Sequence, residues 1–425
     1  MDCEIAVIGA GVAGLTAAGA LARAGRNVRC LEASGRVGGR ILTIHDPLSP
    51  LPVEMGAEFI HGLPPETWSI VAEAGLSTYE HSSHALHIDG GRVLDEKAVG
   101  ERAEKVLEDL AKSHRRKDES FEDFLARCHA RPDIKNWARI HVEGFNAARK
   151  ERISAMQLKE DSDAAHEIEG DRAFRILNGY DALPLHLLKG IPNHAEVMQL
   201  HSAVESIRWK RGEVTIRYRS GFDADIQELR CKRAIVTVPL GVLQAGAIGF
   251  DPQPGDILEA ARTMEFGQVY RVTFRFRERF WEKDDQFKSA GFFISQVKPF
   301  FTWWTTLPAI APMLTGWCAG PAADALAGAD RARVFGEALT CLGKILNRPI
   351  PRPCAAWFED WRENPLFGGA YSYVPAGGMP ARDALTRPVE DTLYFAGEAT
   401  NHAGHGGTVH GAIGSASRAV AQILK

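Results

Sequence analysis

Near the start of the chain, apolar and polar positions change from strand spacing to helix spacing and back. Residues 4–8 (EIAVI) form a short apolar run, which is typical of a buried strand. Residues 15–24 (LTAAGALARA) are rich in Ala and Leu with helical periodicity, and residues 27–31 form a second strand-like run. Residues 9–14 (GAGVAG) stand between the first run and the helix. The pattern predicts a strand, a glycine-rich turn, a helix and a second strand.

The end of the chain carries a similar pattern. Residues 393–396 (LYFA) predict a short strand that leads into Gly397 and Glu398. Residues 408–424 predict a helix with a glycine-rich entry. Both ends therefore carry turns of the type that binds a nucleotide. We expect segments almost four hundred residues apart in sequence to meet around one elongated ligand.

Between these ends the pattern is mixed. Residues 95–130 are highly charged, with apolar positions at the spacing of an amphipathic helix. Residues 196–204 and 214–219 predict strands. Residues 269–277 alternate between apolar and polar side chains, which predicts a strand with one buried face. We interpret the aromatic run at 300–304 as ordinary core, because most large aromatic side chains are buried.

The glycine-rich turn has the chemistry of a phosphate site. Its glycines, at positions 9, 11 and 14, let the backbone approach a pyrophosphate, and the positive end of the following helix stabilises the charge. Glu32 ends the second strand and is placed to accept from ribose hydroxyls. The next segment, 35–40 (GRVGGR), brings more glycines near the ligand, and Arg40 can bind a phosphate through two donors. This extra segment favours FAD over NAD.

The helix that begins at Thr408 adds a second charge effect. Its N-terminus can stabilise the negative charge that develops at N1 and the C2 carbonyl of a reduced isoalloxazine. Glu398 can hydrogen-bond the ribityl chain or nearby ribose hydroxyls.

These residues and several further motifs resemble the FAD-dependent amine oxidase family, which includes monoamine and polyamine oxidases and the flavin-type lysine-specific histone demethylase. The matching motifs are GAGVAGL (9–15), GRVGGRI (35–41), MGAEFIHG (55–62), VTVPLGVL (236–243), FG (266–267) with RFW (279–281), WRENPLFGGAYSY (361–373), FAGEAT (395–400) and TVHGA (408–412). The resemblance covers essentially the whole chain and implies an α/β fold. It implies a discontinuous Rossmann-like FAD-binding domain (residues 1–75, 180–265 and 376–425) and an α+β substrate domain with a helical insert (76–179 and 266–375).

The resemblance also implies which residues bind the cofactor. They are Gly9, Gly11, Ala13, Gly14, Glu32, Ala33, Arg36, Gly39, Arg40, Gly56, Ala57, Glu58, Phe59, Val204, Trp361, Gly397, Glu398, Thr408 and Val409. Among these, Val204 is expected beside the adenine. Monoamine oxidases carry at position 370 the cysteine that links to the flavin, whereas this chain has Ala370. The FAD is therefore expected to be non-covalent.

Four residues are candidates for catalysis. Related oxidases orient the neutral amine in a cage of two aromatic rings in front of the flavin. Here Tyr371 occupies one of these positions and Thr408 the other, so only one of the two rings is present. His61 matches a histidine near the substrate nitrogens in polyamine oxidases and can accept from an ammonium. Structural roles for Tyr371 and His61 stay open. Glu58 either contacts the flavin through its backbone or attracts a cationic amine.

Arg271 is the fourth candidate and departs from the family, much of which has a lysine that reaches toward flavin N5 through a water. A guanidinium stays charged and cannot act as a base. Facing the flavin, Arg271 would favour the reduced anionic state and repel a protonated amine; facing away, it would be a solvated strand residue. The sequence leaves both interpretations open.

Composition limits the partners. The 425 residues carry a net charge of −4, which gives no indication of a nucleic-acid surface. No apolar run reaches about twenty residues, so we expect no membrane anchor. Seven scattered cysteines without a CxxC pair favour a reducing, cytoplasmic setting. His402, His405 and His410 stand among glycines and lack further ligands, so we expect no metal.

Together these observations predict an enzyme that oxidises a primary, secondary or polyamine substrate to an imine and reduces O2 to H2O2. Two alternatives stay open. One is an FAD-dependent dehydrogenase or desaturase with another acceptor, suggested by Arg271. The other is a flavin-binding module with little turnover. The identity of the amine and the oligomeric state cannot be predicted from the sequence.

Overall fold

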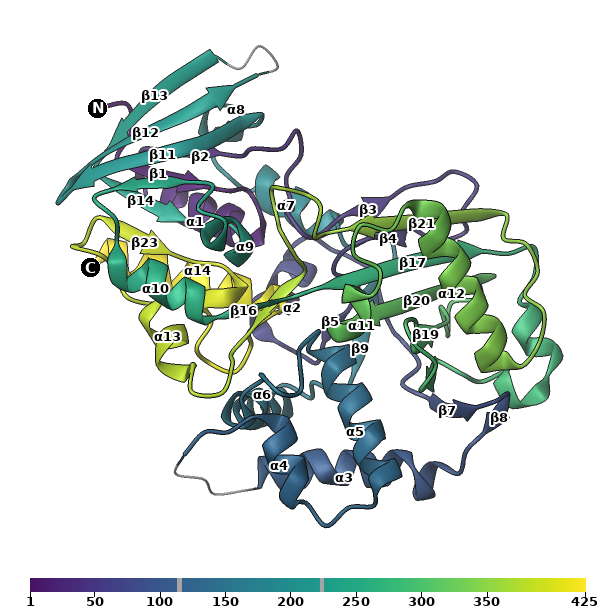
Figure 1. The fold of residues 1–425 in the computed structure, drawn as a ribbon. Helices are drawn as coiled ribbons and strands as arrows, with labels where there is room; N and C mark the ends of the chain where they lie inside the picture. The colour runs from purple at the N-terminus through teal and green to yellow at the C-terminus, as the bar shows by residue number, and fades with distance from the viewer. Residues whose placement is uncertain (113–116, 222–224) are drawn as a thin grey trace.

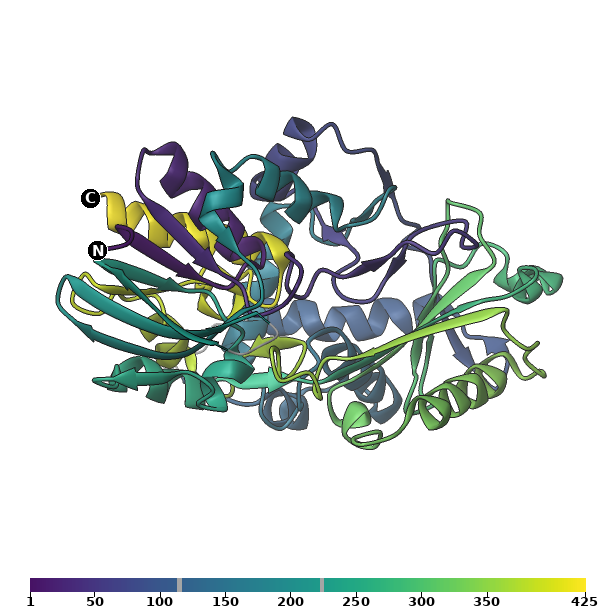
Figure 2. The same ribbon diagram turned by 90° about the horizontal axis from the view of Figure 1, so that it is seen from above.

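The computed structural model describes residues 1–112, 117–221 and 225–425. Two large sheets lie on opposite sides of the molecule, with a group of helices beside them (Figure 1). Both chain ends lie with the smaller, parallel sheet, as the view from above also shows (Figure 2). None of the helices within the described ranges is long and apolar enough to cross a membrane.

The parallel sheet has five strands in the order β10-β2-β1-β14-β23. They span Met198–Gln199, Val28–Leu31, Ile5–Ile8, Arg233–Val236 and Leu393–Phe395. Strand β1 is central, and its side chains alternate between two faces. Ile5 and Val7 pack against the helix layer, whereas Ala6 and Ile8 pack on the other side. The sheet is therefore buried on both faces, as parallel sheets generally are.

The helix layer contains the first and the last long helices of this region. Helix α1 (Val12–Arg23) and helix α14 (Val409–Leu424) pack against each other, and α2 (Pro65–Glu73) and α7 (Ala182–Lys189) flank them. The helices and the short strands predicted at both chain ends are therefore present, with shifts of a few residues at their boundaries. The two ends of the chain share one core.

A four-stranded, mostly antiparallel sheet covers the other face. Its order is β13-β12-β11-β15, spanning Asp225–Cys231, Glu213–Ser220, Ser202–Lys210 and Gly249–Asp251. The single strand predicted at 196–204 is wrong. Helix α8 (His194–Val197) and strand β10 come first, and His201 then turns the chain with a left-handed φ of 52°. Because of this turn, β10 and β11 belong to different sheets.

The larger sheet has seven strands in the order β21-β17-β20-β19-β18-β7-β8. They span Ala355–Asp360, Val269–Arg275, Met313–Ala319, Thr302–Trp304, Phe292–Ser295, Ala85–Asp89 and Arg92–Val93. Helix α12 (Arg331–Leu346) packs on it through Val334 and Leu342. The prediction of one buried face for β17 is wrong, because Arg271 and Thr273 on its polar side are also buried. Strand β17 lies between two neighbours, and its polar side is covered as well.

The charged segment 95–130 folds as several helices. After the short helix η1 (Glu96–Ala98) come α3 (Gly100–Ala111) and α4 (Phe121–Arg127), and residues 113–116 lie outside the described part. Their apolar faces meet α5 (Pro132–Phe145) and α6 (Ala155–Glu167) in a separate small core. The predicted domain boundaries stay a prediction.

Candidate active site

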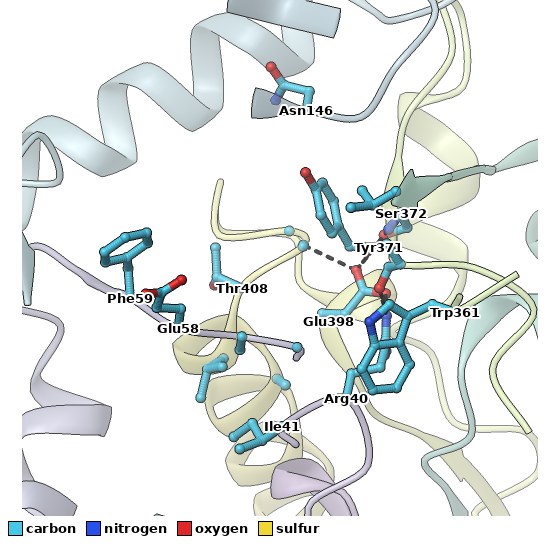
Figure 3. A pocket seen from close by; sticks show the side chains of 18 of the residues that line it. Arg40, Ile41, Glu58, Phe59, Asn146, Trp361, Tyr371, Ser372, Glu398 and Thr408 are labelled. Carbon is cyan, nitrogen blue, oxygen red and sulfur yellow. Dashed lines mark hydrogen bonds and ion pairs between the residues drawn. The ribbon is translucent and has the colours of Figure 1, made fainter. Parts of the chain in front are cut away.

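A cavity of about 1040 Å³ extends from the glycine-rich turn after β1 to the larger sheet and the helices α3, α5 and α6. Figure 3 shows part of its wall. Most of the predicted site residues line this cavity: Gly9, Gly11, Ala13, Glu32, Ala33, Gly39, Arg40, Gly56, Ala57, Glu58, Phe59, His61, Val204, Arg271, Trp361, Tyr371, Gly397, Glu398, Thr408 and Val409. Gly14 and Arg36 lie outside the lining. The structure thus gathers residues from five distant segments around one space.

The glycine turn forms an open cradle at one end of the cavity. Gly9 has a φ of 100°, which favours glycine. A Cβ on Gly14 would lie 1.8 Å from the Gly9 carbonyl, so Gly14 allows helix α1 to pack onto the turn. A Cβ on Gly11 would meet nothing within 4 Å. No side chain caps α1 at Gly11, which leaves a helix N-terminus suited to a phosphate.

The second glycine-rich motif, GRVGGRI (35–41), is hydrogen-bonded to this turn. Gly38 N–H donates to the Ala10 carbonyl at 2.8 Å. The Arg36 guanidinium donates to the carbonyls of Gly39 (2.7 Å) and Ile41 (2.9 Å), so Arg36 fixes the loop rather than facing the cavity. Glu32 lines the cavity while its Oε2 accepts from Ala10 N–H at 2.6 Å.

Arg40 and Glu398 join the two ends of the chain beside the cavity (Figure 3). The Arg40 guanidinium donates to Glu398 Oε1 at 2.8 Å and to the Ala370 carbonyl at 2.7 Å. The other oxygen of Glu398 accepts from Ser372 Oγ at 2.6 Å and from Gly407 N–H at 3.1 Å. Both predicted ligands of the cofactor therefore also hold the protein segments together.

Tyr371 and Thr408 lie on the same wall of the cavity (Figure 3). Tyr371 comes from β22 (Tyr371–Tyr373), and its hydroxyl donates to the Phe145 carbonyl at 2.7 Å. Thr408 caps α14, because its Oγ1 accepts from Gly411 N–H at 2.9 Å. The Tyr371 ring is thus fixed by a bond to helix α5, and Thr408 on the same wall leaves more room than a ring.

Arg271 belongs to a buried ionic cluster, which rules out the solvated interpretation. Its side chain is 3% exposed, pairs with Glu58 Oε2 and donates to the Gly56 carbonyl at 3.0 Å. Glu58 Oε1 pairs with Arg175 at 2.9 Å, and Trp304 Nε1 donates to Glu58 Oε2 at 3.1 Å. The Arg271 guanidinium also lies over the Trp304 ring, 5.4 Å from its centroid.

The charges in this cluster compensate one another. Burial raises the pKa of the Glu58 carboxyl, but Arg175 and Arg271 lower it by more, so the pKa lies below its ordinary value. Behind it, burial raises the pKa of Glu54 to about 7, although the carboxylate accepts from Thr43 Oγ1 at 2.6 Å. Glu58 is therefore ionised and already held by two arginines.

His61 lies on β5 (Ile60–His61), and its ring meets that of Phe145 edge-to-face with centroids 5.6 Å apart. Burial lowers the pKa of His61 to about 4, so the ring is neutral at physiological pH. Burial likewise lowers the pKa of His410 to about 3. Within the described ranges no group of three or more His, Cys, Asp or Glu side chains is arranged to hold a metal ion.

Several residues of the cavity wall were missed by the sequence reasoning. They are His141, Phe145 and Asn146 from α5 and its C-terminal end, Gln157 and Asp161 from α6, and Trp304 and Trp317 from the larger sheet. Arg175, on β9 (Ala173–Ile176), was missed as well; it does not line the cavity but pairs with Glu58. The only signal for this group was the aromatic run at 300–304, which was interpreted as core. Trp303 is core, whereas Trp304 is buried and also lines the cavity.

Comparison with known proteins identifies the family of this chain. The family profile described as "Flavin containing amine oxidoreductase" matches residues 12–424. The chain belongs to this family. It is 30% identical to "Lysine-specific histone demethylase 1 homolog 2" of Oryza sativa subsp. japonica, covering all of this chain but 57% of that protein. It is also 30% identical to "Polyamine oxidase 3" of the same organism, covering 96% of this chain and 86% of that protein.

The chain spans about half the length, or less, of the histone demethylase relatives that it matches. Solved structures confirm the fold of this chain. Putrescine oxidase bound to putrescine has a TM-score of 0.84 at 21% identity, covering 100% of this chain and 99% of the other. Cyclohexylamine oxidase from Brevibacterium oxydans IH-35A has a TM-score of 0.83 at 22% identity, with the same coverage. The predicted family and the α/β fold of FAD-dependent amine oxidases are thus confirmed.

The residues present fit the cofactor of this family, FAD. The open cradle at Gly11 and the uncapped start of α1 suit the pyrophosphate, and Glu32 lies at the end of β2 where a ribose is expected. The cavity continues from there past Arg40 and Glu398 to Tyr371 and Thr408. One continuous cavity thus joins the site expected for the dinucleotide to the candidate catalytic residues.

Proposed function

We propose that this protein oxidises a small primary, secondary or polyamine substrate to an imine and passes the electrons to O2. The observation that carries the proposal is the single cavity that joins the phosphate cradle to Tyr371 and Thr408. The names of relatives, polyamine oxidase and putrescine oxidase, support amines as the substrates.

When bound, FAD supplies the two-electron acceptor for this chemistry. In the overall reaction the amine loses a hydride equivalent from its Cα–H and a proton from nitrogen, which makes a C=N bond. Water then hydrolyses the imine to an aldehyde and releases the amine or ammonia. O2 takes up the two electrons and two protons and becomes H2O2.

The protein side chains prepare the amine for this step. Tyr371, fixed through Phe145, provides one flat wall against which the substrate is oriented. The neutral ring of His61 can accept a hydrogen bond from the amine, since burial lowers its pKa to about 4. The aromatic side chains Phe59, Trp304 and Phe292 exclude water from the same space. A neutral amine with a free lone pair is favoured there.

Arg271 supports the second candidate, a dehydrogenase or desaturase with an acceptor other than O2. Its guanidinium is held by Glu58 and the Gly56 carbonyl at the place where related oxidases carry a lysine. A guanidinium stays charged, so Arg271 cannot exchange protons with a bound water as the amine of a lysine can. The two candidates share the amine half-reaction and differ in the acceptor.

Anaerobic mixing of the FAD-loaded protein with a panel of amines, followed by air, tests the proposal. We expect bleaching of the flavin by at least one amine and rapid recovery of its colour in air. Bleaching without recovery indicates the dehydrogenase. No bleaching by any amine contradicts both enzymes and leaves a flavin-binding module.

Acid precipitation tests the attachment of the cofactor. Because Ala370 stands where a linking cysteine would be, we expect all yellow colour to move into the supernatant. Colour that stays with the precipitated chain contradicts a non-covalent FAD.

All seven cysteines are free, which also supports a cytoplasmic setting for the enzyme.

A further inference from the structure

Two of the seven cysteines stand opposite each other where the parallel sheet begins. Strands β1 and β14 are parallel neighbours, and their register pairs Ile5 with Arg233. The same register, extended by two residues toward the start of each segment, pairs Cys3 with Cys231. Cys231 is the last residue of β13, and the N-terminal segment lies beside the end of this strand (Figure 1).

Backbone hydrogen bonds on both sides of the two cysteines hold this register. Asp2 N–H donates to the Arg230 carbonyl at 2.9 Å, and Lys232 N–H donates to the Glu4 carbonyl at 2.9 Å. Neighbouring strands lie about 4.7–4.9 Å apart, and the Cα atoms of a disulfide usually lie about 4.4–6.8 Å apart. The register therefore brings the Cα atoms of the two cysteines within the range of a disulfide.

The two thiols also share one environment. Both are free and buried, and both belong to the core between the parallel sheet and the four-stranded sheet. A hydrogen bond from the Cys231 thiol to the ionised Cys3 sulfur lowers the pKa of Cys3; burial raises it, and the positive charge of Arg29 lowers it further. The same contact, together with burial, raises the pKa of Cys231. Cys3 is therefore the sulfur that ionises first and is the better nucleophile.

The pair lies only one residue below the surface. Cys3 is 2% exposed and Cys231 is fully buried, but each stands between residues that are exposed or half-buried, namely Asp2, Glu4, Arg230 and Lys232. Local opening at the end of a sheet admits a molecule as small as hydrogen peroxide. The peroxide needs to reach only the Cys3 sulfur, because Cys231 already stands opposite it.

We propose that Cys3 and Cys231 are a peroxide-sensitive thiol pair, which hydrogen peroxide closes to a disulfide. The Cys3 thiolate attacks one oxygen of the peroxide, which gives a sulfenic acid and hydroxide; the hydroxide takes up the proton that Cys3 has lost. The Cys231 thiol then attacks the Cys3 sulfur, so that the S–S bond forms and water leaves. In total, two thiols are oxidised and one H2O2 is reduced to two waters.

The source of the peroxide rests on the proposed function, because amine oxidation with O2 as the acceptor releases H2O2 from this same protein. Strand β1 leads directly to Gly9 of the nucleotide cradle, so the disulfide fixes the start of the strand that carries the turn. Closing so long a loop restricts the unfolded chain. The oxidised protein is therefore more resistant to heat, and small thiols reverse the change.

The test treats the FAD-loaded protein with H2O2 in the absence of any amine. The dose is raised until Cys354, which is exposed, is oxidised. Remaining thiols are then alkylated, and the protein is digested without reductant. Mass spectrometry should find the peptides of Cys3 and Cys231 joined to each other in most molecules. Cys3 and Cys231 that are both recovered as alkylated thiols, although Cys354 has been oxidised, overturn the proposal.

Two variants separate the pair from general oxidation. In wild type, peroxide should raise the midpoint of thermal unfolding by about 5 °C, and dithiothreitol should reverse this rise. Cys231→Ser cannot complete the disulfide, so the rise should disappear and dimedone should trap a sulfenic acid at Cys3. Cys354→Ser is the matched control and should keep both the joined peptides and the rise. An equal rise in Cys231→Ser overturns the proposal.

Failure of the pair can be told apart from failure of the proposed function. During turnover in air with an amine that bleaches the flavin, the same disulfide should form, and catalase should suppress it. If turnover releases H2O2 but the two cysteines stay reduced, amine oxidation stands and the thiol-pair proposal falls. If added H2O2 joins the cysteines but turnover releases none, the thiol pair stands and the acceptor in the proposed function is not O2.

Discussion

The two ends of the cavity are built by different means. At the nucleotide end, the wall is made of backbone: glycines of one short turn, a helix N-terminus and a loop bonded to that turn through Gly38. At the substrate end, the wall is made of side chains such as Tyr371, which is fixed by the Phe145 carbonyl, far away in sequence. A backbone site depends little on the identity of side chains other than its glycines. A site of separate side chains can change its specificity one residue at a time.

The largest effect on FAD binding is expected from filling the backbone site. Gly14→Ala places a methyl group against the Gly9 carbonyl, 1.8 Å from the oxygen, so helix α1 must move away from the turn. Overpacking usually costs about 1–3 kcal/mol, and here no flexible side chain can yield. We expect FAD affinity to fall by about a hundredfold or more, measured as the flavin retained on dilution.

Gly336→Ala is the matched control for this change. Gly336 lies in α12, and its added methyl group would meet nothing within 4 Å. It should leave FAD binding unchanged and raise stability by up to about 1 kcal/mol, as expected for Gly to Ala in a helix. Equal loss of FAD in both variants contradicts the role of the turn.

The next effect comes from the ionic cluster between the two ends. Glu58→Gln leaves Arg175 and Arg271 without their shared carboxylate, and breaking a buried pair costs about 3–5 kcal/mol. Because the pKa of Glu58 is lowered in the folded protein, its contribution is present above the unfolded carboxyl pKa of about 4.3 and is lost as the pH falls through the folded value.

Urea unfolding at pH 7 and at pH 4 measures both the stability cost of Glu58→Gln and the dependence of that cost on pH. The difference between wild type and Glu58→Gln should shrink at the lower pH. Glu80→Gln, which removes an exposed ion pair with Arg172, serves as the control and should cost less than about 1 kcal/mol. A Glu58 variant as stable as the Glu80 variant would show that the cluster contributes little.

A smaller effect is expected at the substrate wall. Tyr371→Ala removes the ring that is held by the Phe145 carbonyl, and loss of positioning should slow anaerobic flavin reduction by roughly tenfold. Tyr371→Phe keeps the ring and loses only the hydroxyl, so its reduction rate should stay much closer to wild type. Reoxidation by O2 should change little in either variant. Stopped-flow spectroscopy of both half-reactions checks this, and equal rates for the Ala and Phe variants would contradict an orienting ring.

The smallest effect is expected for Arg271→Lys, because lysine keeps the charge and the pairing with Glu58. It loses the flat contact with Trp304 and the donor to the Gly56 carbonyl. We expect a change of a few-fold, roughly, in the rate of reoxidation, or a shift of the flavin absorption band. Reduction, reoxidation and spectrum that all match wild type would remove the support for the dehydrogenase.

The parts of the molecule that could be predicted are those governed by local sequence. The turn at residues 9–14 needs its glycines whatever surrounds it, and the helix that begins near Thr408 follows from its own periodicity. Alternation along residues 269–275 predicted a strand but not the burial of Arg271. That burial depends on Glu58, from the loop before β5, and on Trp304, from β19 of the same sheet.

Contacts between residues so far apart cannot be predicted from the local sequence. Arg175 lies 117 residues from Glu58, in a strand whose sequence, AFRI, is that of any half-buried strand. Asp161 lies among several acidic residues of α6, and only the fold shows which carboxylate turns toward the cavity. The distribution of charge around a pocket is a property of the tertiary structure.

The pairing of the first and last segments has a consequence for synthesis on the ribosome. Strand β14 pairs with β1 on one side and with β23, from residues 393–395, on the other. Arg40 bonds to Glu398, which is 358 positions later in the sequence. Until residues 393–398 have been synthesised, the nascent chain exposes an unpaired edge of the parallel sheet and leaves Arg40 without its carboxylate partner. We therefore expect firm capture of the flavin only after this segment has joined the sheet.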